Sequence, residues 1–137
     1  MVIVDSSVLI DLLNRKVNPH TQWLEHESGR YVIGLTDLIL YEILQGARNE
    51  SNAQAIQERL LRFQVWDTGG IQRAVAAAAN FRKLRLLGVT VRKTVDCLIA
   101  SFCIADGHQL LHRDRDFDAF ETHLGLSVIH PPETGTN

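Results

Sequence analysis

The stretch from Val95 to Ala105 predicts a helix that is apolar on almost every side and carries a single carboxylate, Asp96, in its first turn. Helices with apolar residues all round are usually buried at the centre of a domain. An unpaired charge in such a place is strongly destabilising, so it needs a polar cavity, a cation or strong hydrogen-bond donors beside it. The fold of this chain therefore has to bring a polar partner to Asp96.

The composition is that of an ordinary globular protein, with 137 residues, 45% hydrophobic and 22% charged. This length predicts one domain with a core of its own. No apolar run reaches the roughly 18–20 residues that a membrane span needs, and no basic region precedes the first apolar residues as it does in a signal peptide. We therefore expect a cytoplasmic protein without membrane contact.

The two cysteines, Cys97 and Cys103, lie six residues apart within the predicted apolar helix. This spacing places them on different faces of the helix, so neither a disulfide nor a metal site is expected from them. We expect both to be small core residues.

Short apolar runs alternate with helical patterns along the whole chain. Strands are predicted at residues 1–4, 31–34, 109–112 and 126–129, with a shorter candidate at 65–66. Helices are predicted at residues 7–14, 20–27, 36–46, 50–63, 70–88, 94–106 and 114–123. This alternation predicts a three-layer α/β/α domain with a small, mainly parallel central sheet. We expect it to span residues 1–130, followed by a flexible C-terminal tail, residues 131–137.

Carboxylates follow two of the predicted strands directly. Asp5 comes after the first strand, and Asp114 and Asp116 come after the strand at 109–112. In open α/β sheets, sites form beyond the carboxyl ends of the strands, so these acids are expected at one edge. Each has a simpler alternative, because Asp5 and Asp114 can cap helices, and Asp96 and Asp116 suit the dipole of a first helical turn.

Glu42 is the acid that these alternatives do not explain, because it lies in the middle of a predicted helix. Its neighbours one turn earlier are Leu38 and Ile39, and those one turn later are Gln45 and Gly46. An acid in this apolar setting is either exposed at the rim of the core or part of a polar pocket. We expect Glu42 to share a pocket with Asp96.

Several carboxylates without a cysteine or histidine cluster indicate a hard cation, Mg²⁺ or Mn²⁺, rather than zinc. The six histidines are scattered, and the sequence contains neither a Gly-rich phosphate loop nor a G-x-S-x-G motif. Such a cation activates water and stabilises the charge that develops when a phosphodiester is hydrolysed. The acids therefore predict a metal-dependent hydrolase of phosphodiesters.

The net charge of −2 gives no general attraction to nucleic acid, but the basic residues are unevenly placed. Residues 68–95 contain no acid and six basic residues: Arg73, Arg82, Lys83, Arg85, Arg92 and Lys93. This segment is either a solvated helix face or a phosphate-binding rim beside the acidic pocket.

Three segments resemble the PIN-domain ribonucleases, and specifically the VapC-type toxins of VapBC toxin–antitoxin modules. They are residues 2–10 (VIVDSSVLI), residues 41–48 (YEILQGAR), and the block that runs from Asp96 to Phe117. They follow the order and spacing of that family and span nearly the whole chain. The resemblance implies a PIN-like fold and a metal-dependent endoribonuclease.

The resemblance also implies roles for individual residues. Asp5, Glu42, Asp96 and Asp114 match the catalytic acids, with Asp5 and Asp96 as principal metal ligands. Glu42, Asp114 and Asp116 would bind through waters or hold a second ion. Ser6 or Ser7 would orient Asp5 or contact the substrate phosphate. One departure is His112, where the family more often has Thr or Ser.

The expected substrate is single-stranded or loop RNA, because unpaired bases are accessible there. Candidate RNA contacts are Arg82, Lys83, Arg85, Arg92, Lys93 and Arg113. The family further implies a homodimer and a cognate VapB-type antitoxin, whose C-terminal segment would occupy the cleft. Two alternatives stay open from sequence alone: an RNA-processing PIN nuclease without a toxin role, and a catalytically inactive PIN-like binding module.

Overall fold

The computed structural model, which describes residues 1–133, contains a sheet of five parallel strands. The strands are β1 (Val2–Val4), β2 (Ile33–Thr36), β3 (Gln64–Trp66), β4 (Gln109–Leu111) and β5 (Ser127–Val128). Their order across the sheet is β3-β2-β1-β4-β5, so the first strand is central. Every residue of β1 is at most 1% exposed, as its β-branched sequence predicts for a parallel strand covered on both faces.

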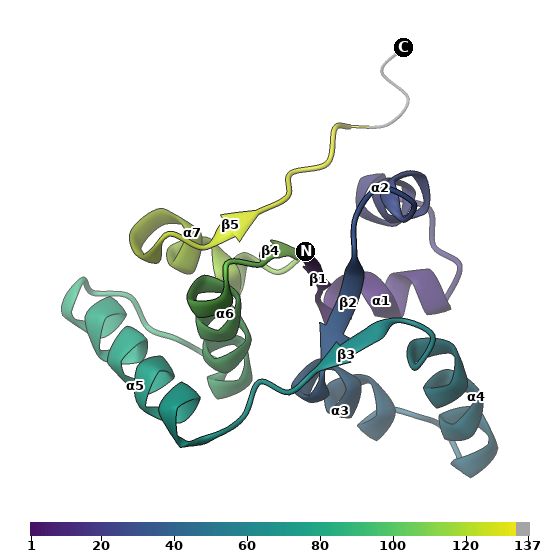
Figure 1. Cartoon of the computed structure of the whole chain (residues 1–137), viewed down its shortest axis with the longest axis horizontal. Coiled ribbons are helices and arrows are strands. Elements are labelled where there is room, and N and C mark those ends of the chain that lie inside the picture. The colour runs from purple at the N-terminus through teal and green to yellow at the C-terminus, as the bar shows by residue number, and fades with distance from the viewer. Residues whose placement is uncertain (134–137) are drawn as a thin grey trace.

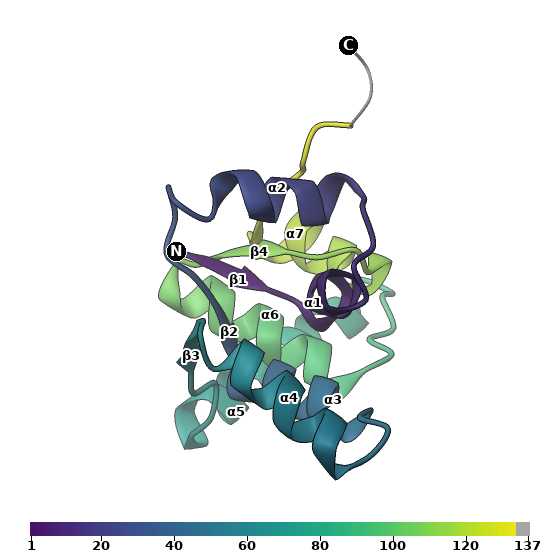
Figure 2. The same ribbon diagram turned by 90° about the vertical axis from the view of Figure 1, so that its right-hand side faces the viewer.

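Helices cover both faces of this sheet. They are α1 (Ser6–Leu13), α2 (Pro19–Glu27), α3 (Asp37–Gln45), α4 (Glu50–Leu60), α5 (Ile71–Leu86), α6 (Thr94–Asp106) and α7 (Asp118–Leu124). Figure 1 shows α5, α6 and α7 on one side of the sheet and α1, α2 and α4 on the other. Figure 2 looks onto the side that α1, α2 and α4 cover. α3 contacts α1 and α6. The predicted three-layer α/β/α architecture is confirmed.

Successive strands lie first on one side of β1 and then on the other. From β1 the chain proceeds outward through β2 to β3, and it then returns through α5 and α6 to place β4 on the other side of β1. The strands are paired with Val4 opposite Leu111. Such a switch point is where open α/β sheets form their crevices, beyond the carboxyl ends of the strands.

Side-chain caps begin four of the helices. Asp5, Asn18, Thr36 and Asn49 each have extended backbone and accept a hydrogen bond from an N–H in the first helical turn. These caps satisfy donors that the helix itself leaves unpaired. They confirm the helix starts that the sequence predicted at these positions.

Helix α6 is the predicted central apolar helix. Seven of its residues are buried: Asp96, Cys97, Ile99, Ala100, Ser101, Phe102 and Cys103. Both cysteines are free and buried, as predicted, and burial raises the pKa of the Cys103 thiol to about 12. The helix ends at Gly107, whose φ of 71° lies in the left-handed region that favours glycine.

Three local predictions were wrong in detail. Thr94 is the first residue of α6 and not its cap, because Lys93 holds the extended cap position. β2 begins at Ile33, two residues later than predicted. The predicted helix at 114–123 is split into a 3-10 turn, Arg115–Phe117, and α7, because the Asp114 side chain accepts from the N–H of Asp116 and closes a tight turn.

Residues 131–133 have no regular structure, and residues 134–137 of the predicted tail lie outside the described part of the chain. Within residues 1–133, none of the helices has the length and hydropathy that crossing a bilayer requires.

Gly34 in β2 lies where the ring of Trp66 and the backbone of β3 leave no room for a Cβ. A Cβ added there would overlap the ring of Trp66 and the carbonyl oxygen of Gln64. We expect Gly34→Ala to lower the free energy of unfolding by about 3 kcal/mol, because neither the backbone nor the ring has room to move. Chemical denaturation measures this change.

Gly29→Ala is the matched control, because a Cβ at Gly29 would have nothing within 4 Å. We expect its unfolding free energy to stay within about 0.5 kcal/mol of the wild type. Equal effects of the two substitutions would contradict the packing argument.

Candidate active site

Asp5 lies at the switch point, immediately after β1, and is 3% exposed. Its backbone N–H donates to the carbonyl of Leu111 at 2.9 Å, which extends the β1–β4 ladder by one residue. Its Oδ2 accepts from the Ser7 N–H at 3.1 Å and from the Ser7 hydroxyl at 2.7 Å. The Ser7 oxygen in turn accepts from the Arg113 N–H at 3.0 Å. Ser7 therefore orients Asp5 and ties α1 to the segment after β4.

Asp96 and Glu42 face the same space from α6 and α3. Asp96 is 3% exposed, and Glu42 is partly buried. The Ser6 side chain lies close enough to the Glu42 carboxylate to lower its pKa, against the larger effect of burial. The two helices are in contact, so the mid-helix acid lies next to the acid of the central helix.

Asp114 and Asp116 complete the group. One carboxylate oxygen from each of Asp96, Asp114 and Asp116 lies within 4.8 Å of the others. Lys93 stands at this edge, with its ammonium 3.3 Å from the Asp114 carboxylate, and this pairing raises the pKa of Lys93. The structure thus places together all of the acids that the sequence singled out.

The pKa values of three of these acids are raised. Burial raises the pKa of Asp96 to about 7, and the charges of Asp5 and Asp114 add to this effect. Burial also raises the pKa of Asp5, against the opposing hydrogen bonds from Ser7. The pKa of Glu42 is raised by burial and then by the charge of Asp5. Carboxylates held this close favour a bound cation, which removes the repulsion.

Three buried oxygens in this pocket have no hydrogen-bond partner among residues 1–133. They are Oδ1 of Asp5, Oε1 of Glu42 and Oδ2 of Asp96. Buried polar atoms are nearly always paired, so three unpaired carboxylate oxygens together indicate that a ligand supplies the missing interactions. Oxygen donors of this kind suit Mg²⁺ or Mn²⁺. The residues present therefore fit a divalent cation.

The sequence model of the PIN domain matches residues 2–122. The chain belongs to the PIN-domain family. It is 32% identical over 136 residues to VapC ribonuclease Mb1587 of Mycobacterium bovis and to ribonuclease VapC11 of Mycobacterium tuberculosis, which places it with the VapC-type members. Each match covers 93% of this chain and 97% of the relative.

Crystal structures of the family have the same fold. VapBC2 from Rickettsia felis, bound to a DNA fragment from its promoter, contains a chain that superposes with a TM-score of 0.77 at 18% identity, covering 94% of this chain and 98% of that one. FitAcB from Neisseria gonorrhoeae gives a TM-score of 0.73 at 18% identity, with 96% and 98% covered. The predicted PIN-like fold is confirmed.

The basic residues predicted to contact RNA do not share one environment. Arg82 and Arg85 line an apolar depression of about 500 Å³ between α5 and the first turn of α6. Lys83 and Arg92 are exposed. Arg113 instead pairs with Asp11 on α1, so its guanidinium ties two elements together beside the acids.

Two residues near the acids form contacts that the sequence did not predict. Asp11 is 8% exposed and accepts from both Arg113 and Asn18; its i, i+4 spacing from Ser7 on the predicted helix was the available signal. His112 is 8% exposed, and its ring accepts from the Asp114 N–H at 3.1 Å. The scattered spacing of the histidines concealed this role.

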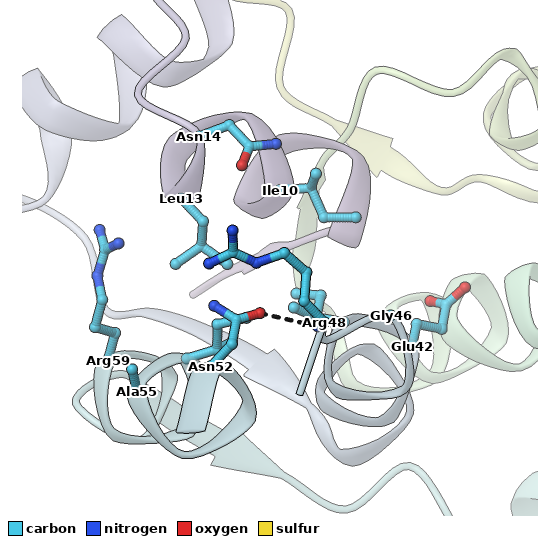
Figure 3. Close-up of a pocket in the computed structure, with 11 residues that line it drawn as sticks. Ile10, Leu13, Asn14, Glu42, Gly46, Arg48, Asn52, Ala55 and Arg59 are labelled. Carbon is cyan, nitrogen blue, oxygen red and sulfur yellow. Dashed lines mark hydrogen bonds between the residues drawn. The ribbon is translucent and has the colours of Figure 1, made fainter. Parts of the chain in front are cut away.

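A groove of about 520 Å³ opens beside Glu42, between α1, α3 and α4. Figure 3 shows Ile10 and Leu13 of α1 on one wall, and Arg48, Asn52 and Arg59 opposite. The Arg48 N–H donates to the Asn52 side chain at 3.1 Å. Neither arginine forms an ion pair with any residue from 1 to 133.

The raised pKa of Asp96 gives the metal-free protein a definite dependence on pH. The folded state binds a proton at Asp96 up to about pH 7, whereas the ordinary value is 3.8. Stability therefore falls as pH rises from about 4 to 7 and stays low above that. In the presence of chelator at pH 8, we expect Asp96→Asn to raise the free energy of unfolding by on the order of 2 kcal/mol.

Denaturant unfolding at pH 5 and pH 8 measures this effect. Asp67→Asn is the control, because Asp67 is an exposed carboxyl, and we expect it to leave the stability unchanged. A variant Asp96→Asn that is less stable than the wild type at pH 8 would refute the account of Asp96 as a destabilising charge.

Proposed function

We propose that this chain is a divalent-metal-dependent endoribonuclease and the toxin component of a type II toxin–antitoxin system. The observation that carries the proposal is the set of three buried, unpaired carboxylate oxygens of Asp5, Glu42 and Asp96. They lie at the switch point of a PIN domain whose relatives include VapC ribonucleases. We place this activity in residues 1–130 and assign no part of it to residues 131–137.

Asp5 and Asp96 are the proposed direct ligands of Mg²⁺ or Mn²⁺, because they are the most deeply buried acids of the group. Glu42, Asp114 and Asp116 would act through waters or hold a second ion. When bound, such a cation lowers the pKa of a water molecule and stabilises charge on the phosphate. Catalysis then depends on how firmly the chain holds these oxygens.

The remaining polar residues of the site have supporting roles. Ser7 fixes the Asp5 carboxylate through its N–H and hydroxyl, and the Ser6 side chain lowers the pKa of the nearby Glu42. Lys93 at the rim offers an ammonium group close to Asp114, where it would attract the scissile phosphate. In the hydrolysis, the water oxygen bonds to phosphorus and the bond from phosphorus to the leaving ribose oxygen breaks.

The proposed partners follow from the charge and shape around the site. A VapB-type antitoxin would place its C-terminal segment in the groove of Figure 3, where Ile10 and Leu13 offer an apolar wall and Arg48 and Arg59 attract acidic residues. An antitoxin arginine reaching Glu42 would pair with the acids by charge-assisted hydrogen bonds. The proposed active form is a homodimer in the cytoplasm.

Cleavage of RNA by the purified chain tests the proposed activity. We expect endonucleolytic products from structured RNA with Mg²⁺ or Mn²⁺, and none with chelator. Asp96→Asn keeps the shape of the side chain but removes its charge, so we expect the cleavage rate to fall at least about 100-fold. Gel analysis of end-labelled RNA measures both effects.

Asp67→Asn is again the control, and we expect it to cleave at the wild-type rate. Cleavage that persists in chelator or in Asp96→Asn would overturn the metal-site proposal. Metal binding without cleavage of any RNA would favour the inactive binding module. Cleavage confined to one precursor RNA, without growth arrest on expression, would favour the RNA-processing nuclease.

The proposed RNA contacts lie in the C-terminal half of α5, in the segment that leads to α6, and directly after β4. They are Arg82, Lys83, Arg85, Arg92, Lys93 and Arg113. In the inactive Asp96→Asn background, we expect the pair Arg82→Gln and Arg85→Gln to weaken RNA binding. The slope of log affinity against log salt should fall by about 1.4, because each phosphate contact on a single strand contributes roughly 0.7.

The matched control is the pair Arg48→Gln and Arg59→Gln, which removes the same charge from the groove of Figure 3. We expect this pair to keep the original salt slope and to weaken inhibition by an antitoxin instead. A flattened slope in the control pair would place the RNA in the groove, and an unchanged slope in the α5 pair would favour a solvated helix face for Arg82 and Arg85. Filter binding at several salt concentrations separates these results.

A further inference from the structure

His112 lies beside Asp5 across the junction of β1 and β4. The strand register pairs Val4 with Leu111, and the Asp5 N–H continues the ladder by donating to the Leu111 carbonyl at 2.9 Å. The next residues in this register are Asp5 and His112. Residues paired in register on neighbouring strands, which are roughly 4.8 Å apart, direct their side chains to the same face. The imidazole ring is therefore a neighbour of the Asp5 carboxylate.

The His112 ring is held firmly in one orientation. Its Nδ1 accepts a hydrogen bond from the Asp114 N–H at 3.1 Å. Its ring centroid lies 4.9 Å from that of Phe117, and the residue is 8% exposed. A nitrogen that accepts carries no proton, so the ring is neutral and its proton is on Nε2.

The Nε2 atom of His112 is a buried donor without a partner among residues 1–133, and Oδ1 of Asp5 is a buried acceptor without one. Leaving both unpaired is destabilising. A single water molecule between these neighbouring groups would satisfy the Nε2 donor and one lone pair of Oδ1, which leaves the second lone pair of Oδ1 for the cation. The other oxygen of Asp5 is already fixed by Ser7, so such a bridge would fix the whole carboxylate plane.

We propose that His112 is a positioning residue for the metal site, and the proposal rests on the proposed function. Its Nε2–H orients Asp5 Oδ1 through a bridging water, while its Nδ1 holds the backbone of Asp114. One ring thereby sets the relative position of two acids that come from different strands. Hydrogen bonds of this kind to ligating carboxylates typically change metal affinity by about 10–100-fold.

The alternative is that His112 only fills space against Phe117, and substitutions that divide its two nitrogens distinguish the two roles. Asparagine places an amide oxygen near the Nδ1 position, so His112→Asn keeps the acceptor for Asp114 and loses the donor toward Asp5. Glutamine places an amide N–H₂ near the Nε2 position, so His112→Gln keeps the donor. The exposed His123 supplies a control, His123→Asn.

Mn²⁺ alone serves as the probe, with its affinity measured by electron paramagnetic resonance in the absence of RNA. We expect His112→Asn to bind Mn²⁺ about tenfold more weakly than the wild type. His112→Gln should remain within about threefold of the wild type, and His123→Asn should equal it. Unfolding midpoints confirm that each variant is folded.

Two results would overturn the assignment. One is wild-type Mn²⁺ affinity in His112→Asn, and the other is an equal loss in His112→Asn and His112→Gln, because the Nε2 donor would then have no specific effect on Asp5. Nitrogen-15 spectra of the metal-free protein add a separate readout, in which the His112 proton must be on Nε2. A wild-type chain that binds no Mn²⁺ refutes the proposed function, whereas binding that is insensitive to His112 refutes only this assignment.

Discussion

The mutual repulsion of buried carboxylates at the β1–β4 switch point is the constraint on which the rest of the structure depends. Asp5 and Asp96 are almost fully buried, burial raises the pKa of each, and the charge of Asp5 raises the pKa of Asp96 further. A flexible pocket would relieve this repulsion by letting the acids move apart. The fold prevents this because each acid is mounted on a different rigid element, and the elements are joined by packing and by hydrogen bonds such as that from Arg113 to Ser7.

Helix α6 explains how the structure tolerates such a pocket. Five apolar residues of this helix are buried around or beyond the turn that carries Asp96: Cys97, Ile99, Ala100, Phe102 and Cys103. Each fully buried aliphatic or aromatic side chain contributes roughly 1.5–3 kcal/mol, which offsets an unfavourable charge at one end of the helix. The metal-free pocket is thus a local loss of stability within a helix that stabilises the core, a common compromise at functional sites.

The sequence predicted which acids lie close together, because Asp5 and Asp114 follow strand ends and Glu42 has no capping role. It also predicted the layers, the central helix and its termination at Gly107. It was insufficient where the outcome depends on contacts between distant segments. The pairing of Arg113 with Asp11 joins residues 102 apart in the chain. The place of His112 depends on the register of β4 against β1, and no spacing along one segment encodes that register.

The net charge is only −2, but the basic side chains divide into those that form ion pairs and those that do not. Arg73 pairs with Asp106, Lys93 with Asp114, and Arg113 with Asp11. Each of these pairs joins two elements around the core. Among the described residues, no such pair is formed by Arg82 and Arg85 on α5, or by Arg48 and Arg59 beside the groove of Figure 3. Two separate sets of unpaired arginines therefore remain, one on α5 and one beside the groove that Glu42 lines, and the proposed RNA contacts and the proposed antitoxin site use one set each.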